Sequence, residues 1–143
     1  ERAVVVHGTM ADPRWIDPAV DPNDRKPGWC YLGDPKVVNM SPIGLARYAS
    51  LRSWLSQWSL DDAQGDGPDN LAKTSVPTIV INNSADDACT PSHSQRLFDA
   101  VPHADKIFHE IKGATHYYDG QPELGRQAVG IVADWLHAHN LDL

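Results

Sequence analysis

Two kinds of side chain that together can act as a general base occur thirty positions apart in the second half of the chain. Asp86 and Asp87 follow an apolar run at 78–81, and His116 follows a second such run at 106–111. An aspartate that holds a histidine in one tautomer lets the imidazole take a proton from a nucleophile. We therefore interpret an aspartate of this pair and His116 as two of the three members of a catalytic triad.

The third member, the nucleophile, has no clear counterpart in this sequence. The chain contains no Gly-x-Ser-x-Gly pentapeptide, which places a serine on the sharp turn between a strand and a helix. Cys30 follows Gly28 at the right offset, but the second glycine and a buried strand before it are missing. Ser41 precedes Pro42, as a residue that caps a helix would. We expect neither Cys30 nor Ser41 to be the nucleophile.

The elements that must position Asp86 and His116 alternate between short apolar runs and amphipathic segments. The expected elements are strands at 78–81 and 106–111, a helix that Thr90 and Pro91 open and that ends near Ala100, and a helix from Glu123 to about His139. This order implies parallel strands joined by right-handed crossovers, hence an α/β fold. Functional groups of such sheets gather beyond the carboxyl ends of the strands. The expected inward face of the last helix consists of Ala128, Ile131, Val132, Trp135 and Leu136.

The first half of the chain is less regular. Residues 3–6 are typical of a strand buried on both faces, and residues 8–41 are rich in proline, aspartate and glycine. The length and the tryptophans of 8–41 are typical of a lid or wall over a pocket and, equally, of a packed surface loop. A helix is expected from 42 to 58, and 61–70 is expected to be a solvated loop. The helix face expected to pack in the core is made of Leu45, Tyr48, Ala49, Leu51, Arg52, Leu55 and Trp58.

Composition narrows the class of protein. The chain has 143 residues with a net charge of −7, which favours one domain or part-domain and argues against binding to nucleic acid. Two cysteines cannot form a disulfide framework, and no run of apolar residues is long enough to span a membrane, so we expect a cytoplasmic protein. The seven histidines lack compact ligand spacing. We therefore expect no metal and no cofactor.

Two stretches resemble the α/β-hydrolase superfamily. Residues 76–87 (Val-Pro-Thr-Ile-Val-Ile-Asn-Asn-Ser-Ala-Asp-Asp) resemble the strand and acid loop of that family, and Gly113-Ala114-Thr115-His116 resembles its histidine loop. Asn83 stands where the family usually has glycine, and asparagine also tolerates left-handed backbone geometry. The resemblance implies that Asp86 is the catalytic acid and His116 the base. Asp87 stays open as the alternative acid.

The resemblance implies the C-terminal part of an α/β-hydrolase fold. Residues 8–75 would form a lid-like or cap-like insertion, and residues 76–143 a strand-helix-strand-helix core with the acid and histidine loops. The implied activity is serine-type hydrolysis of an ester, thioester or related acyl bond, with the serine in a missing upstream segment. The partners would be a small-molecule acyl substrate and the N-terminal half of the same fold, and homo-oligomer formation stays open. The alternative is a non-catalytic α/β domain that binds a small molecule or a partner chain.

Overall fold

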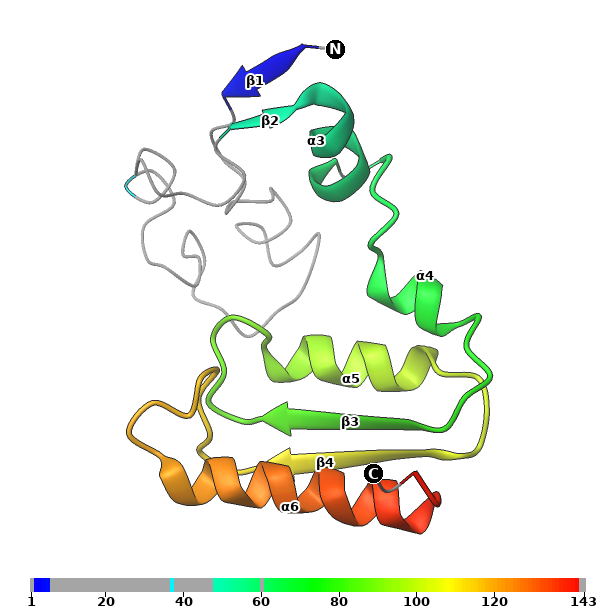
Figure 1. Ribbon diagram of the computed structural model, residues 1–143, viewed down its shortest axis with the longest axis vertical. Helices are drawn as coiled ribbons and strands as arrows, with labels where there is room; N and C mark the ends of the chain where they lie inside the picture. Colours follow the sequence, from blue (N-terminus) through cyan, green and yellow to red (C-terminus); the bar gives the residue numbers. More distant parts are fainter. Residues whose placement is uncertain (1, 6–36, 38–47, 60, 142–143) are drawn as a thin grey trace. The chain divides into compact units, whose positions relative to one another are not determined.

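The computed structural model describes residues 2–5, 37, 48–59 and 61–141 (Figure 1). The chain divides into two compact units, Glu1–Asn70 and Leu71–Leu143. Most of the expected lid, including Cys30 and Ser41, lies outside the described residues, so the lid stays a prediction.

The first unit contains a small antiparallel sheet, and Ala3 in it is exposed, so the prediction of a strand buried on both faces is wrong at Ala3. Strand β1 (Ala3–Val5) pairs antiparallel with strand β2 (Tyr48–Ser50), with Val4 opposite Ala49. The prediction of a helix over 42–58 is therefore wrong at 48–50. The helix, α3 (Leu51–Trp58), begins only after Ser50, whose Oγ accepts a hydrogen bond from the Ser53 N–H at 3.1 Å. A serine cap of this kind satisfies an otherwise unpaired donor and fixes the start of the helix.

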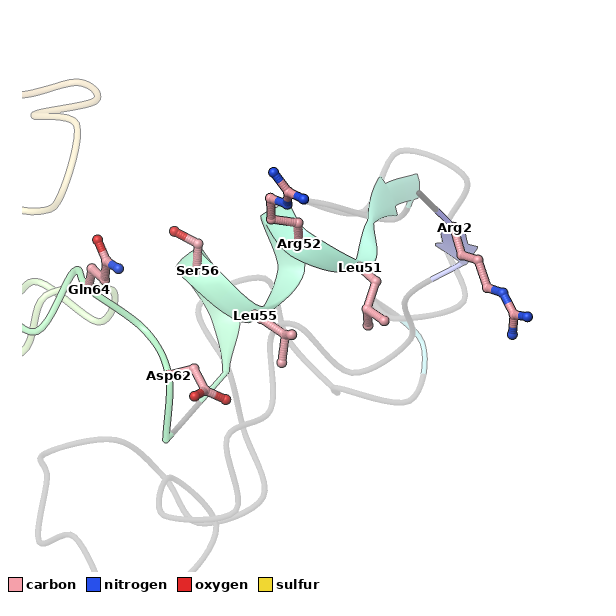
Figure 2. Close-up of a pocket in the computed structure, with 7 residues that line it drawn as sticks. All are labelled: Arg2, Leu51, Arg52, Leu55, Ser56, Asp62 and Gln64. Carbon is pink, nitrogen blue, oxygen red and sulfur yellow. The ribbon is translucent and has the colours of Figure 1, made fainter.

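The apolar face of α3 is more exposed than a core face. Leu51 is 45% and Leu55 37% exposed, so the prediction that both pack in the core is wrong. Both leucines instead line an open hollow of about 520 Å³, together with Arg2, Arg52, Ser56, Asp62 and Gln64. Figure 2 shows the two leucines projecting from one side of α3 and Arg52 and Ser56 from the other. The hollow therefore extends around the helix surface.

The acidic stretch after α3 contains a short helix that was predicted to be loop. Helix α4 (Gly67–Leu71) is preceded by Asp66, whose Oδ1 accepts a hydrogen bond from the Asp69 N–H at 2.9 Å. Pro68 suits the first helical turn because that position needs no N–H donor. The capping aspartate and the proline together explain a helix in a sequence that is otherwise typical of a loop.

The second unit is an α/β unit with a parallel pair of strands, as predicted. Strand β3 (Thr78–Asn83) pairs with β4 (Lys106–Ile111) in a register that runs from Thr78 opposite Lys106 to Asn83 opposite Ile111. Helix α5 (Pro91–Ala100) connects the strands, and α6 (Pro122–Ala138) follows β4. In Figure 1 both arrows point the same way, and the loops that leave their heads lie at the same end of the sheet.

The most buried apolar residues of this unit lie at both ends of the sheet, with Val101 after α5 and Ile111 at the end of β4. Val101 is 1% exposed and Ile111 is fully buried. The Lys106 ammonium donates to the carbonyls of Phe98 and Val101 at 2.8 and 2.7 Å, which satisfies acceptors at the end of α5. The rings of Phe98 and Phe108 pack edge to face with centroids 5.5 Å apart. These contacts hold the C-terminal half of α5 against the sheet.

Helix α6 has the predicted extent but a narrower inward face. Ala128, Ile131, Trp135 and Leu136 are half-buried, whereas Val132 is 37% exposed, so its prediction as an inward residue is wrong. None of the helices in the described part of the chain is both long and apolar enough to cross a membrane.

Candidate functional site

The two residues chosen from the sequence meet at one end of the parallel sheet. Asp86 lies in the loop after β3 and His116 in the loop after β4 (Figure 1). His116 Nδ1 lies 2.9 Å from Asp86 Oδ2, which is a hydrogen-bonding distance. Parallel strands bring their carboxyl ends to the same edge, so residues thirty positions apart become neighbours.

The carboxylate of Asp86 is held by its own loop. Its Oδ1 accepts hydrogen bonds from the N–H groups of Ala88 and Cys89, both at 2.8 Å, and the Asp86 N–H donates to the Asn83 carbonyl at 3.0 Å. The side chain is only 7% exposed. Asp86 is thus the acid that contacts His116, and Asp87 is exposed on the same loop. Two backbone donors on one oxygen leave the other oxygen aimed at the imidazole.

This network determines the tautomer of His116. Oδ1 accepts two N–H donors and Oδ2 faces the ring, so the hydrogen bond to Oδ2 requires the proton on Nδ1. The neutral ring then carries its lone pair on Nε2. The His116 side chain is 31% exposed, and the Tyr117 ring packs against it edge to face at 4.6 Å between centroids. This arrangement suits an imidazole that accepts a proton from a group approaching Nε2.

Asn83 connects the two loops through its side chain. Its Nδ2 donates to the Thr115 carbonyl at 3.2 Å, and its Oδ1 accepts from the Tyr118 hydroxyl at 2.9 Å. Asn83 does not use the left-handed geometry that asparagine tolerates, because it ends strand β3 in extended geometry. Within the histidine loop, the non-glycine residue in the left-handed region is Tyr118, with φ of +55°. The asparagine therefore serves as a bridge between loops rather than as a turn residue.

A second set of hydrogen bonds fixes the histidine loop. Gln121 accepts from the Thr115 N–H at 2.9 Å and donates to the Gly113 carbonyl at 2.8 Å, and Ser84 Oγ accepts from the Gly113 N–H at 2.7 Å. Gly113 has φ of +78°, a conformation that favours glycine. The Ala85 N–H donates to the Ala114 carbonyl at 3.0 Å. The backbone before His116 is thus restrained on both sides.

Sequence reasoning missed Ser84, Tyr118 and Gln121 as supports of the site. Ser84 and the residue it binds lie 29 positions apart, and Tyr118 and its partner lie 35 apart. Hydroxyl and amide side chains at these positions are common in turns, and no local pattern indicates which distant loop they bind.

Cys89 is a further residue of the site, and no pattern in the sequence indicated it. Asp86, Cys89 and His116 each place one ligand atom within 4.8 Å of the others. Cys89 is exposed, while Asp86 beneath it is buried. The expectation of no metal considered the spacing of histidines alone, and it did not consider this mixed set of oxygen, sulfur and nitrogen ligands.

A second histidine–aspartate pair lies near the other end of the sheet. His139 Nε2 lies 3.1 Å from Asp105 Oδ1, and its Nδ1 lies 2.8 Å from the Trp135 carbonyl. The pKa of His139 is raised above its ordinary 6.5, chiefly by the hydrogen bond to the Trp135 carbonyl and then by Asp105. Both residues line a cavity of about 460 Å³ between β4 and α6.

Comparison with known proteins gives no match: no family model fits the chain, and neither curated proteins nor solved structures show significant similarity to it. The candidate site is therefore defined by its own geometry.

Proposed function

We propose that the chain is the C-terminal part of an α/β-hydrolase fold and supplies the acid and base of a serine-type hydrolase. The substrate class is an ester, a thioester or a related acyl bond. The observation that carries the proposal is the 2.9 Å contact between His116 Nδ1 and a buried Asp86 carboxylate beyond the ends of two parallel strands. Resemblance of the acid and histidine loops to that superfamily supports the same assignment.

The proposed chemistry begins with a serine hydroxyl from a polypeptide segment outside this chain. His116 Nε2 takes the hydroxyl proton as the serine oxygen attacks the acyl carbon, and Asp86 stabilises the imidazolium. The imidazolium then gives that proton to the leaving alcohol or thiol as the acyl–oxygen or acyl–sulfur bond breaks. Water attacks the acyl-serine in the second half of the reaction, with His116 again as the base, and the carboxylic acid and serine are released.

The hydrogen bonds around the site support this role because they reduce the freedom of both loops. Gln121 and Ser84 hold the backbone before His116, and Asn83 joins the two loops. A base must stay within hydrogen-bonding reach of the proton it removes, and small displacements of catalytic groups lower the rate steeply. A surface histidine without a catalytic role would gain little from such restraint.

The test uses the polypeptide encoded by the whole gene. We expect a fluorophosphonate probe to label a serine outside this chain, and His116→Ala to lower hydrolysis of p-nitrophenyl esters and acyl thioesters by several orders of magnitude. His137→Ala is the matched control, because His137 lies exposed at the end of α6. Unchanged turnover in His116→Ala, or probe labelling of Ser41 or Cys30, would contradict the proposal.

The hollow beside α3 favours a second candidate, a non-catalytic binding domain. Leu51 and Leu55 offer apolar contacts there, and Arg2 and Arg52 offer positive charge (Figure 2). Such a surface suits a small ligand with an apolar body and an anionic group. Under this candidate, Leu55→Ala would weaken binding of medium-chain fatty acids in calorimetry, and His116→Ala would leave it unchanged.

A further inference from the structure

The acid loop brings a thiol to the histidine–aspartate pair. Cys89 lies three residues after Asp86, and its backbone N–H donates to Asp86 Oδ1. The same turn that orients the carboxylate therefore also determines where the cysteine side chain begins. The resulting group holds a carboxylate oxygen, a thiol sulfur and an imidazole nitrogen within 4.8 Å of one another.

These three atoms are ligands that Zn²⁺ prefers. Zinc sites take thiolate, imidazole and carboxylate ligands at about 2.0–2.3 Å, and sites with three protein ligands keep a fourth position for water. Those bond lengths in a tetrahedron correspond to ligand–ligand separations of about 3.4–3.7 Å. The geometry points to a binding site for a thiophilic divalent cation of the Zn²⁺ type at Asp86, Cys89 and His116.

Binding requires only small movements of side chains. The ion enters between Asp86 Oδ2 and His116 Nδ1, which must separate from 2.9 Å to roughly 3.4 Å. The sulfur moves inward by rotation of the exposed Cys89 side chain. The buried Asp86 keeps its orientation, because its Oδ1 stays bound to two backbone N–H groups. Asp86 is thus already oriented for binding, and the side chains of Cys89 and His116 adjust their positions.

The proton balance of binding is simple. The Cys89 thiol loses its proton to solvent as the zinc–sulfur bond forms, and the proton on His116 Nδ1 is replaced by one on Nε2, so the ring stays neutral. One proton is released for each ion bound, and the affinity rises with pH until the thiol is ionised.

The site also has a consequence for catalysis, and this part rests on the proposed function. An ion between Asp86 and His116 replaces the hydrogen bond that orients the ring. It also places the ring proton on Nε2, the atom that must accept the serine proton. Bound Zn²⁺ is therefore a reversible inhibitor of acyl transfer.

The experiment measures binding by the chain itself, without reference to turnover. Chain treated with chelator and dialysed is titrated with Co²⁺, whose thiolate complexes show a charge-transfer band in the near ultraviolet, and bound Co²⁺ is then displaced with Zn²⁺. We expect the band in the wild type. Cys89→Ser should abolish it and weaken Zn²⁺ binding at least about tenfold. Cys30→Ser, the matched control, should retain both.

Absence of the band in the wild type, or its persistence in Cys89→Ser, would overturn the site. Should Cys89→Ser fail to fold, the wild type supplies the answer: Zn²⁺ should slow alkylation of Cys89 by iodoacetamide, and an unchanged rate counts against the site.

In the whole-gene protein, Zn²⁺ should inhibit turnover, and removal of Zn²⁺ by a chelator should restore it. Zn²⁺ binding with undiminished turnover would overturn the inhibitory role. A protein with no turnover at all would count against the proposed hydrolase, and the metal site would still stand.

Discussion

Two histidine–aspartate pairs in the described part of the second unit differ in what surrounds them. In the first, His116 meets a buried Asp86 through Nδ1, at the carboxyl ends of the strands. In the second, His139 meets the exposed Asp105 through Nε2 and the Trp135 carbonyl through Nδ1. The residue types are the same, and the burial of the aspartate separates the two pairs: Asp86 is 7% and Asp105 60% exposed.

The difference shows which pair suits proton transfer. A backbone carbonyl only accepts hydrogen bonds, and a carboxylate does the same, so His139 donates from both nitrogens and its charged form is favoured. A ring with a proton on each nitrogen cannot act as a base. His116 instead has Nδ1 occupied by an aspartate whose own orientation is fixed by Ala88 and Cys89. The hydrogen bonds that hold the aspartate therefore matter as much as its presence.

The largest expected effect is a loss of turnover when the aspartate of the first pair is neutralised, whereas the same change in the second pair should have almost no effect. In the whole-gene protein, Asp86→Asn should lower turnover by about 10⁴-fold, because an amide at that position favours the wrong tautomer of His116. Asp105→Asn should leave turnover within a factor of about two. Steady-state kinetics with a p-nitrophenyl ester measures both. Equal losses in the two variants would remove the distinction between the pairs.

Truncation of Ile111 tests the strand that separates the pairs. The side chain is fully buried at the end of β4, and Ile111→Ala should lower the free energy of unfolding by about 2–5 kcal/mol. Urea denaturation followed by circular dichroism gives the value. Ile107→Ala, on the same strand but 41% exposed, is the control and should cost clearly less. A loss as large at Ile107 would show that the core lies elsewhere.

Removal of one hydroxyl tests the bridge between the acid and histidine loops. Tyr118→Phe deletes the donor to Asn83 Oδ1 and should cost about 0.5–1.5 kcal/mol of stability, since the bond is part-buried. The His116 imidazole resonances should broaden or shift, while those of His139 stay unchanged. Tyr48→Phe is the matched control, because Tyr48 is 76% exposed and lies on β2 of the first unit. Identical spectra for Tyr118→Phe and wild type would contradict the bridge.

The smallest expected effect is the change of stability with pH that comes from His139 of the second pair. Folding raises the pKa of His139 above 6.5, so its contribution to stability is complete below pH 6.5 and is lost as pH rises through the folded-state pKa. An NMR titration should show the raised pKa in the wild type. It should fall partway towards 6.5 in Asp105→Asn, because the hydrogen bond to the Trp135 carbonyl remains. A midpoint at or below 6.5 in the wild type would contradict the double-donor arrangement.

Much of the second unit could be predicted from local patterns. The runs that form β3 and β4, the Thr90-Pro91 start of α5 and the periodicity of α6 all lie where expected. The secondary structure of the first unit was harder to predict, because residues 48–50 fit a helical pattern but pair with β1. Partners decide between strand and helix in so short a segment, and the partner lies more than forty positions away.

The sequence by itself determined that an aspartate and a histidine follow successive strands, and the parallel order brings such loops to one edge of a sheet. Only the tertiary structure decided which aspartate meets the ring, that Asn83 bridges two loops, and that Cys89 joins the pair. The physical reason is the separation in sequence between the residues that interact. Strand and helix patterns arise between near neighbours, whereas hydrogen bonds between loops depend on side chains that folding alone brings together.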